Sequence, residues 1–317
     1  MLSDDPRTRA WGRACTGLPL DFAIIGAQKS ASTFLQRRLA EHPDITVLEH
    51  ESRHFEDPDY GRGGLRHLSD LLAPRAGSLT GLKRPDYLPK PEVPGRVADH
   101  VPRIKLLAVL REPVARAVSA YYHLAVFGFV PVMDPSAALA AILDGRMQKD
   151  HPKSQEILEY GRYAAHLRHW HNWFAPEQFL VLLHDDMARD PAGSLATALH
   201  FLDADDTVPR DGVRSTANPG IYWPPRVRLR AARSRRYYDY DTTYGKVSPR
   251  RKGPLAWGMV AGLTAVDKLV LSRLGRDRRP CIDTAVEQRL RDYYASEVED
   301  LASLLNRDLG AWQRSSG

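Results

Sequence analysis

The sequence contains few residues that could form disulfides or a metal site. Only 2 of its 317 residues are cysteines, Cys15 and Cys281, and neither has metal-ligand spacing or a motif partner. We therefore expect free thiols in a reducing compartment, with one long-range disulfide as the alternative. No cluster of histidine, cysteine and carboxylate residues has the spacing of metal ligands, so we predict no bound metal.

Long apolar runs are also missing. The N-terminal residues MLSDDPRTRAWGR are charged, which argues against a secretory signal. Two uncharged runs, Ala117–Met133 and Gly253–Val266, are shorter than the roughly 20 residues of a transmembrane helix. The sequence thus predicts a cytoplasmic protein.

Composition is that of an ordinary globular protein. Hydrophobic residues make up 43% and charged residues 26% of the chain, and the length suits one large α/β domain or two small ones. We predict a single domain over residues 1–317. The formal net charge of +6 suits an anionic ligand or an anionic surface, although it does not bear on the fold.

Apolar runs alternate with helical patterns along the first two thirds of the chain. The residues of the runs predict buried strands, and the helical segments between them predict right-handed βαβ units. Strands are expected at 22–25, 45–48, 79–82, 104–110 and 179–183. Helices are expected at 32–41, from 113 onward, at 161–174 and at 191–202. The fold class is therefore α/β, with a central parallel sheet flanked by helices.

Three parts of the chain differ in composition. A core covers about residues 20–218, and a basic variable flap covers about 220–280. A C-terminal helix within 282–312 has apolar residues at helical spacing. These residues are Leu290, Tyr294, Val298, Leu301 and Leu305.

A loop from Gly26 to Thr33 joins the first strand to the first helix. Such a loop directs backbone N–H groups and the positive helix end toward one point, where phosphates bind. Lys29 adds a full positive charge, while the small residues Ser30 and Ala31 allow a ligand to approach the backbone. Ser32 and Thr33 add hydroxyl groups. The spacing does not match G-x-x-x-x-G-K-[ST], which argues against a nucleoside-triphosphate site. The plain alternative is an ordinary turn with a solvated lysine.

A second anion site is predicted after the strand at 104–110. Arg111 follows this strand at its carboxyl end, where open α/β sheets bind ligands, and Ser119 lies on the helix that follows. A guanidinium group matches the oxygens of a phosphate. The alternative is that Arg111 pairs with Glu112 or another carboxylate.

Both segments resemble motifs of sulfotransferases that use 3′-phosphoadenosine 5′-phosphosulfate (PAPS). FAIIGAQKSASTFLQRRLAEHP resembles the 5′-phosphosulfate loop of the heparan-sulfate-type and bacterial branch, which typically reads K-x-G-T-T or K-G-G-T. Here Ser30 and Ala31 replace the usual glycines. KLLAVLREPVARAVSAYYH resembles the 3′-phosphate motif, strand-R-[DE]-P-x-x-R-x-x-S-x-Y. The resemblance implies a P-loop-like three-layer sandwich that binds PAPS and releases adenosine 3′,5′-bisphosphate (PAP).

The resemblance also assigns roles to residues. The loop residues Lys29, Ser30, Ala31, Ser32 and Thr33 would bind the 5′-phosphosulfate, and Arg111 and Ser119 the 3′-phosphate. The catalytic set is Glu51, Lys29, Lys83 and His54. LEHESRHFEDPDY resembles an E-x-x-x-F segment, so Glu51, followed by Phe55, would be the catalytic base. His54 is the second choice, and Glu49 and His50 are further rivals.

Lys83, in GLKRPDYL, resembles the lysine of an E-K-T-P-x-Y segment that approaches the transferred group, with Arg84 in place of the threonine. Lys29 and Lys83 would then flank the sulfuryl group. The alternative is that both are surface lysines.

The nucleotide-covering loop is ambiguous. A basic loop at Ser248–Gly253, with Arg250, Lys252 and Gly253 as its cofactor-binding residues, is predicted to close over the nucleotide, and the stretch Arg278–Pro280 competes for that role. His166 and His169, on a helix that resembles the one bordering the acceptor cleft, are expected to be packing or solvent-exposed residues and not catalysts.

The predicted function is transfer of a sulfuryl group from PAPS to a hydroxyl of a carbohydrate, lipid or natural-product acceptor. Alternatives are a P-loop-type kinase and a nucleic-acid-binding protein, the latter suggested by arginines interleaved with tyrosines in RVRLRAARSRRYYDY. We expect no nucleic-acid partner, because that run leaves the two phosphate sites unexplained.

The basic flap contains the apolar stretch PLAWGMVAGLTAV. One hypothesis is peripheral contact with an anionic membrane that presents a lipid-linked acceptor. We prefer the alternative, a lid over the cofactor or a core helix with a solvated basic face. The acceptor and the oligomeric state stay open.

Overall fold

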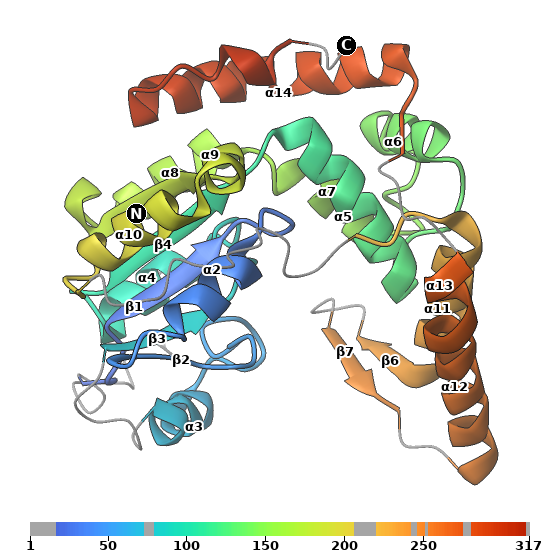
Figure 1. The fold of residues 1–317 in the computed structure, drawn as a ribbon, viewed down its shortest axis with the longest axis horizontal. Helices are drawn as coiled ribbons and strands as arrows, with labels where there is room; N and C mark the ends of the chain where they lie inside the picture. Colours follow the sequence, from blue (N-terminus) through green and yellow to red (C-terminus); the bar gives the residue numbers. More distant parts are fainter. Residues whose placement is uncertain are drawn as a thin grey trace. The chain divides into compact units, whose positions relative to one another are not determined.

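The computed structural model describes residues 17–72, 79–205, 220–241, 246–250, 253–274 and 280–314 (Figure 1). The described chain divides into two compact units. The first contains residues 17–27, 31–110 and 166–205, and the second contains 28–30, 111–165 and the described residues from 220 onward. That they fold as a single domain stays a prediction.

The first unit is built on a five-stranded parallel sheet with the strand order β2-β3-β1-β4-β5. Its strands are β1 (Phe22–Gly26), β2 (Ile45–Val47), β3 (Leu79–Lys83), β4 (Lys105–Leu110) and β5 (Phe179–Leu183). All five strands predicted from the sequence are confirmed, to within about two residues at each end. The order places β1 at the centre of the sheet, so the loop that follows it leaves from the middle of the carboxyl edge.

Burial explains why these segments form central strands. Every residue of β1 is buried, as are the last five of β4, and a strand that is covered on both faces needs such a continuous apolar run. In β3, Gly81 lies against the ring of Phe22, and a Cβ there would fall 2.2 Å from the ring. A glycine is therefore required where these two strands pair.

Helices flank the sheet, as predicted. Those that lie wholly within the first unit are α2 (Ser32–Leu39), α3 (Arg62–Leu72), α4 (Val93–His100), α9 (His184–Arg189) and α10 (Pro191–Phe201). A 3-10 turn, η3 (Pro176–Gln178), precedes β5. Helix α8 (Tyr163–His171) begins in the second unit and ends in the first. Its Trp170 is fully buried and donates its indole N–H to the carbonyl oxygen of Leu88 at 3.1 Å.

The second unit is mainly helical. Its elements begin with α5 (Pro113–Phe127), α6 (Pro135–Leu143), η2 (Pro152–Gln155) and α7 (Glu156–Glu159). They continue with α11 (Pro224–Tyr237), α12 (Pro254–Val266), a π-helical segment (Asp267–Leu271), α13 (Ser272–Leu274), α14 (Thr284–Leu305) and η5 (Gly310–Trp312). Strands β6 (Tyr238–Asp241) and β7 (Lys246–Pro249) pair as an antiparallel hairpin. This hairpin was not predicted from the sequence.

The C-terminal helix packs as its sequence spacing predicts. Leu290, Tyr294, Val298 and Leu301 are buried on α14, whereas Leu305 at its end is only half-buried. The hydroxyl of Tyr294 donates to the carbonyl oxygen of Leu158 at 2.8 Å, which ties α14 to the end of α7.

Two further features bear on the sequence predictions. Cys281 is an exposed free thiol, and Cys15 lies outside the described residues. Within the described residues, no helix is both long enough and apolar enough to cross a bilayer.

Candidate functional site

The loop after β1 has the backbone of an anion cradle. The N–H of Ala27 donates to the carbonyl oxygen of Val109 at 2.8 Å, which anchors the start of the loop to β4. Lys29 and Ala31 then take left-handed backbone conformations, with φ of 68° and 74°. Ala31 precedes helix α2 and its side chain accepts no hydrogen bond from the helix end. The first N–H groups of α2 can therefore serve a bound anion.

In the first unit, Lys83 joins this loop to the predicted base. Lys83 is 4% exposed and lies at the end of β3. Its Nζ donates to Thr33 Oγ1 at 2.8 Å and contacts Glu51 Oε1 at 3.0 Å. Three residues from three separate segments thus meet at one ammonium group, and the alternative of a surface lysine is wrong for Lys83.

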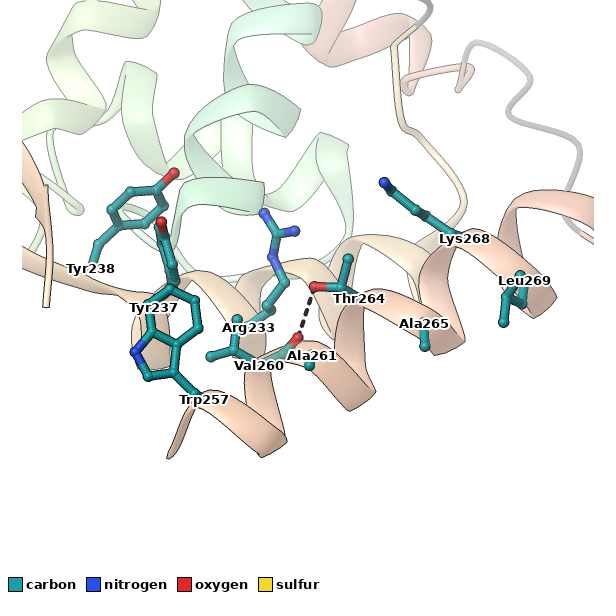
Figure 2. A pocket seen from close by; sticks show the side chains of 10 residues that line it. All are labelled: Arg233, Tyr237, Tyr238, Trp257, Val260, Ala261, Thr264, Ala265, Lys268 and Leu269. Carbon is teal, nitrogen blue, oxygen red and sulfur yellow. Dashed lines mark hydrogen bonds between the residues drawn. The ribbon is translucent and has the colours of Figure 1, made fainter. Parts of the chain in front are cut away.

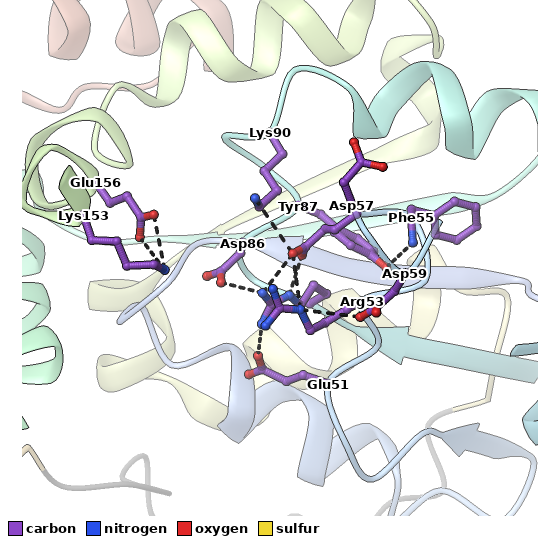
Figure 3. A network of polar contacts seen from close by, with 12 residues as sticks. Glu51, Arg53, Phe55, Asp57, Asp59, Asp86, Tyr87, Lys90, Lys153 and Glu156 are labelled. Carbon is purple, nitrogen blue, oxygen red and sulfur yellow. Dashed lines mark hydrogen bonds and ion pairs between the residues drawn. The ribbon is translucent and has the colours of Figure 1, made fainter. Parts of the chain in front are cut away.

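The other carboxylate oxygen of Glu51 accepts a hydrogen bond from Arg84 Nη1 at 2.8 Å. Arg84 also binds Glu56 through two bonds, Nε to Oε1 at 2.6 Å and Nη2 to Oε2 at 3.1 Å, and it contacts Asp86 at 2.8 Å. Figure 3 shows Glu51 and Asp86 directed toward this cluster, with Lys90 also nearby. Glu56 is fully buried. Arg84 therefore fixes the position of Glu51.

Electrostatics within this cluster favour the charged guanidinium. Burial alone would lower the pKa of Arg84, but the carboxylates of Asp86, Glu56 and Glu51 together raise it above its ordinary value. A buried arginine with three carboxylates keeps its charge, and each of those carboxylates has a cation beside it.

His54 points into a different environment from Glu51. Its ring lies 5.3 Å from the ring of His67, and its Nδ1 is 2.8 Å from Ser52 Oγ. Burial, followed by the proximity of His67, lowers the pKa of His54, while Asp59 partly opposes this. The structure therefore brings Glu51, and not His54, into contact with Lys83 and Arg84.

In the second unit, Arg111 lies against the loop backbone. Arg111 is buried and its Nη1 donates to the carbonyl oxygen of Lys29 at 3.3 Å. The Tyr163 hydroxyl donates to the carbonyl oxygen of Arg111 at 3.0 Å. Burial raises the pKa of Tyr163, so the phenol stays protonated as a donor.

Ser30 brings a buried hydroxyl to the same place. Its Oγ has no hydrogen-bond partner within the described part of the chain. The Tyr163 phenol lies near Ser30, and this side-chain contact opposes the rise that burial causes in its pKa, while the Tyr163 hydroxyl also donates to the carbonyl oxygen of Arg111. Such a buried group is costly unless it has a partner, so a ligand that accepts from it would be favoured.

Glu112, which was the alternative partner expected for Arg111, lies at the start of α5. Glu112 caps this helix and accepts from the N–H groups of Val114 at 2.9 Å and Ala115 at 2.6 Å. Burial raises the pKa of Glu112, although these two hydrogen bonds act against the shift. Ser119 is buried in the second turn of α5. Both carboxylate oxygens of Glu112 therefore accept from the helix end, and the charge of Arg111 also acts on this carboxylate.

The residues predicted to cover the nucleotide lie at the β6–β7 hairpin, before helix α12, or outside the described residues. Arg250 follows β7, pairs with Asp239 of β6 and donates its backbone N–H to the carbonyl oxygen of Tyr237 at 2.9 Å. Lys252, Arg278 and Arg279 lie outside the described residues, and Gly253 precedes helix α12. The segment expected as a loop is thus partly a strand, because Ser248 and Pro249 belong to β7.

Two residues of the site escaped the sequence analysis. Arg84 was noted only as a departure from a threonine in the family motif, and Glu56 was not singled out. The one signal for them was the density of opposite charges in ESRHFEDPDY and KRPDY. His169, expected to serve packing, bonds to the carbonyl oxygen of Pro91 at 2.9 Å. The described residues hold no group of three or more His, Cys, Asp or Glu side chains arranged to bind a metal ion.

Comparison with known proteins gives independent evidence for the family of this chain. A family model described as the sulfotransferase domain matches residues 19–216. Human heparan sulfate glucosamine 3-O-sulfotransferase 6 is 34% identical over 179 residues, which cover 56% of this chain and 51% of the human protein. The bifunctional heparan sulfate N-deacetylase/N-sulfotransferase 1 of Caenorhabditis elegans is 26% identical over 239 residues, 69% of this chain and 28% of that protein. The match to the first of these relatives thus spans about half of its length.

Among solved structures, a sulfotransferase from Alicyclobacillus acidocaldarius superposes with a TM-score of 0.63 at 23% identity. The match covers 93% of this chain and 99% of that one. This likeness shows the fold, and it confirms the predicted P-loop-like α/β class.

Proposed function

Because this chain belongs to the sulfotransferase domain family, we propose that it transfers a sulfuryl group from PAPS to a hydroxyl group of its acceptor. One observation carries the proposal: the Lys83 ammonium group lies 2.8 Å from Thr33 Oγ1 and 3.0 Å from Glu51 Oε1. A cation that contacts both helix α2, where we propose that the phosphosulfate binds, and a carboxylate suits a reaction in which a hydroxyl loses a proton while an anion departs.

The chemistry of the surrounding groups fits PAPS. The start of α2 supplies N–H donors for the 5′-phosphosulfate, and the buried Ser30 hydroxyl supplies one more. Arg111 and Ser119 of the second unit would hold the 3′-phosphate. PAPS would supply the sulfuryl group and a stable leaving group.

We assign separate roles in the transfer step to residues of the first unit. Each carboxylate oxygen of Glu51 contacts one cation, Lys83 Nζ or Arg84 Nη1, and keeps a second lone pair that can accept a hydrogen bond. We assign to Glu51 the acceptance of the proton from the acceptor hydroxyl. Arg84 holds the carboxylate in place, and Lys83 provides positive charge beside the transfer point. Lys29 is proposed as the second cation.

For the acceptor class, we favour a glycan hydroxyl. The names of the relatives in the comparison describe sulfation of heparan sulfate, one of them at a glucosamine 3-O position. Lipid and natural-product hydroxyls remain alternatives. The cytoplasmic location also remains a prediction.

The donor is tested by thermal unfolding in the presence of PAP, ATP or single-stranded DNA. Of the three ligands, we expect only PAP to stabilise the protein, by about 2.7 kcal/mol at a PAP concentration of 100 times its Kd. Stabilisation by ATP with magnesium but not by PAP would favour the kinase alternative instead. Stabilisation by DNA alone would favour a nucleic-acid-binding protein.

The base is tested by Glu51→Gln, with His54→Gln as the matched variant. We expect Glu51→Gln to reduce transfer from PAPS by roughly 10²–10⁴-fold, the usual contribution of a general base, while the PAP-induced stabilisation is kept. His54→Gln should retain transfer to within about tenfold. The opposite pattern would move the base assignment to His54, and full activity of Glu51→Gln would remove Glu51 from the mechanism.

A further inference from the structure

A nearly continuous helical stretch in the second unit exposes an unusual amount of apolar surface. It comprises α12, the π-helical segment and α13, residues 254–274. Of the ten large hydrophobic side chains that are exposed among the described residues, six lie in this stretch. They are Trp257, Met259, Val266, Leu269, Val270 and Leu274, with exposed fractions from 42% to 71%. A core helix would bury these residues, so that interpretation of the apolar stretch is wrong.

The exposed face is fixed in orientation by an ion-pair cluster on the opposite side. Asp267 is buried and pairs with Arg226 at 2.8 Å and Arg230 at 3.3 Å, both from α11. The exposed face also includes Gly258 and Gly262, where an added Cβ would meet nothing within 4 Å. The helix is therefore attached along one side and left open along the other.

The part of the sequence that carries this face is strongly basic. Residues 220–280 contain 15 of the 45 Lys and Arg residues and 4 of the 39 Asp and Glu residues, a formal charge of +11. The remainder of the chain therefore carries −5. The acidic residues Asp239 and Asp267 are paired with arginines, so their negative charges are not left to repel an approaching anion.

A groove of about 670 Å³ between α11 and α12 is lined by basic side chains, Arg233 and Lys268, together with apolar ones. Figure 2 shows Arg233 and Lys268 pointing to one side of α12, while Ala265 and Leu269 point to the other. Trp257 lies at one end of the groove. Basic groups beside an apolar face, with a tryptophan at the boundary, are typical of helices that lie in a membrane interface.

We propose that this face of residues 254–274 docks on an anionic lipid surface. The apolar side chains enter the boundary between headgroups and acyl chains, and the surrounding arginines and lysines contact lipid phosphates. A second copy of the chain is a poorer occupant, because two segments of charge +11 repel each other. A nucleic acid would satisfy the charge but would leave Met259, Leu269 and Leu274 exposed. The proposal does not depend on the sulfotransferase chemistry.

The test is co-sedimentation of the full chain with vesicles. Wild-type protein is mixed with phosphatidylcholine vesicles that contain either no anionic lipid or about 30% phosphatidylglycerol, at low and high salt. The variant Met259→Glu/Leu269→Glu removes two apolar contacts. The control Met133→Glu/Leu71→Glu changes the same residue types and the same charge at two exposed positions outside the stretch, where exposure is 38% and 41%. Circular dichroism checks that each variant is folded.

We expect wild type and control to bind anionic vesicles only, with binding reduced by salt. The Met259→Glu/Leu269→Glu variant should bind at least about tenfold more weakly. Equal binding to neutral vesicles, no binding by wild type, or an equal loss in the control would overturn the proposal. So would a wild-type dimer that the variant makes monomeric without vesicle binding, or binding to single-stranded DNA in place of vesicles.

Discussion

Ala31 has a backbone conformation that favours glycine. Its φ of 74° and ψ of 18° are left-handed, where a Cβ costs roughly 1–2 kcal/mol. In the resembling family motif this position is a glycine, and the structure gives the physical reason. The chain turns from the loop into α2 here, and Ala31 keeps the turn at the expense of strain.

We predict that Ala31→Gly raises the free energy of unfolding by about 0.5–1 kcal/mol. The relief of strain at positive φ exceeds the extra entropy that glycine loses on folding. The control is Ala40→Gly, since Ala40 ends the same helix at a φ of −69°. This variant should be destabilised. Urea unfolding of both proteins measures the difference, and a loss of stability in Ala31→Gly would contradict the argument.

His54 gives the protein a pH-dependent contribution to stability. Because the pKa of His54 is lowered in the folded state, the unfolded chain binds more protons than the folded one as the pH falls through about 6.5. This stability is present above pH ~6.5 and is lost as the pH decreases toward the folded pKa. We expect His54→Gln to reduce the decline in unfolding free energy between pH ~7 and pH ~5.

The control for that experiment is His50→Gln, an exposed histidine four residues earlier in the chain. This variant should keep the wild-type pH dependence. If His54→Gln shows a decline as steep as that of wild type, the half-buried His54 does not contribute to the dependence.

At the scale of elements, Arg84 connects two loops that leave neighbouring strands. Glu51 and Glu56 follow β2, and Asp86 follows β3 just after Arg84 itself. These strands pair in parallel, so their carboxyl ends lie at the same edge of the sheet. The cluster therefore holds the segment that carries Glu51 against the end of β3.

We predict that Arg84→Met lowers the free energy of unfolding by about 3–5 kcal/mol, because it leaves the fully buried Glu56 without its main partner. Arg189→Met is the control, since Arg189 is 76% exposed and pairs with Asp186 at the surface. Removal of that pair should cost at most about 1 kcal/mol. Chemical denaturation measures both, and similar losses would show that the Arg84 cluster adds no more than a surface pair.

At the scale of the whole molecule, neither compact unit is a continuous stretch of chain. The chain passes from one unit to the other within the loop at residues 27–31 and again at residues 110–111 and 165–166. We therefore predict one cooperative transition in differential scanning calorimetry, with equal calorimetric and van't Hoff enthalpies. PAP should raise its midpoint. Two separate transitions, of which PAP shifts one alone, would contradict the predicted single domain.

Much of the fold could be predicted from the sequence because parallel strands buried on both faces need continuous apolar runs. FAIIG, KLLAVL and FLVLL meet this need, and each forms a strand. Short or polar elements were harder. The β6–β7 hairpin has a weak pattern, and the placement of its residues depends on contacts with distant segments. Helix α3 was not predicted either, although its buried Leu65, Leu68 and Leu72 have helical spacing.

The sequence by itself determined the fold class and the family. It also identified the loop after β1, Lys83 and Arg111 as candidates for anion binding, because these assignments depend only on residue types and on their spacing along the chain. Tertiary structure alone decided which charges meet. It separated Glu51 from His54, made Arg84 the centre of a buried cluster, and left the apolar stretch of residues 254–274 exposed. Those outcomes depend on which strand ends and helix faces become neighbours, and spacing along the chain does not specify such long-range contacts.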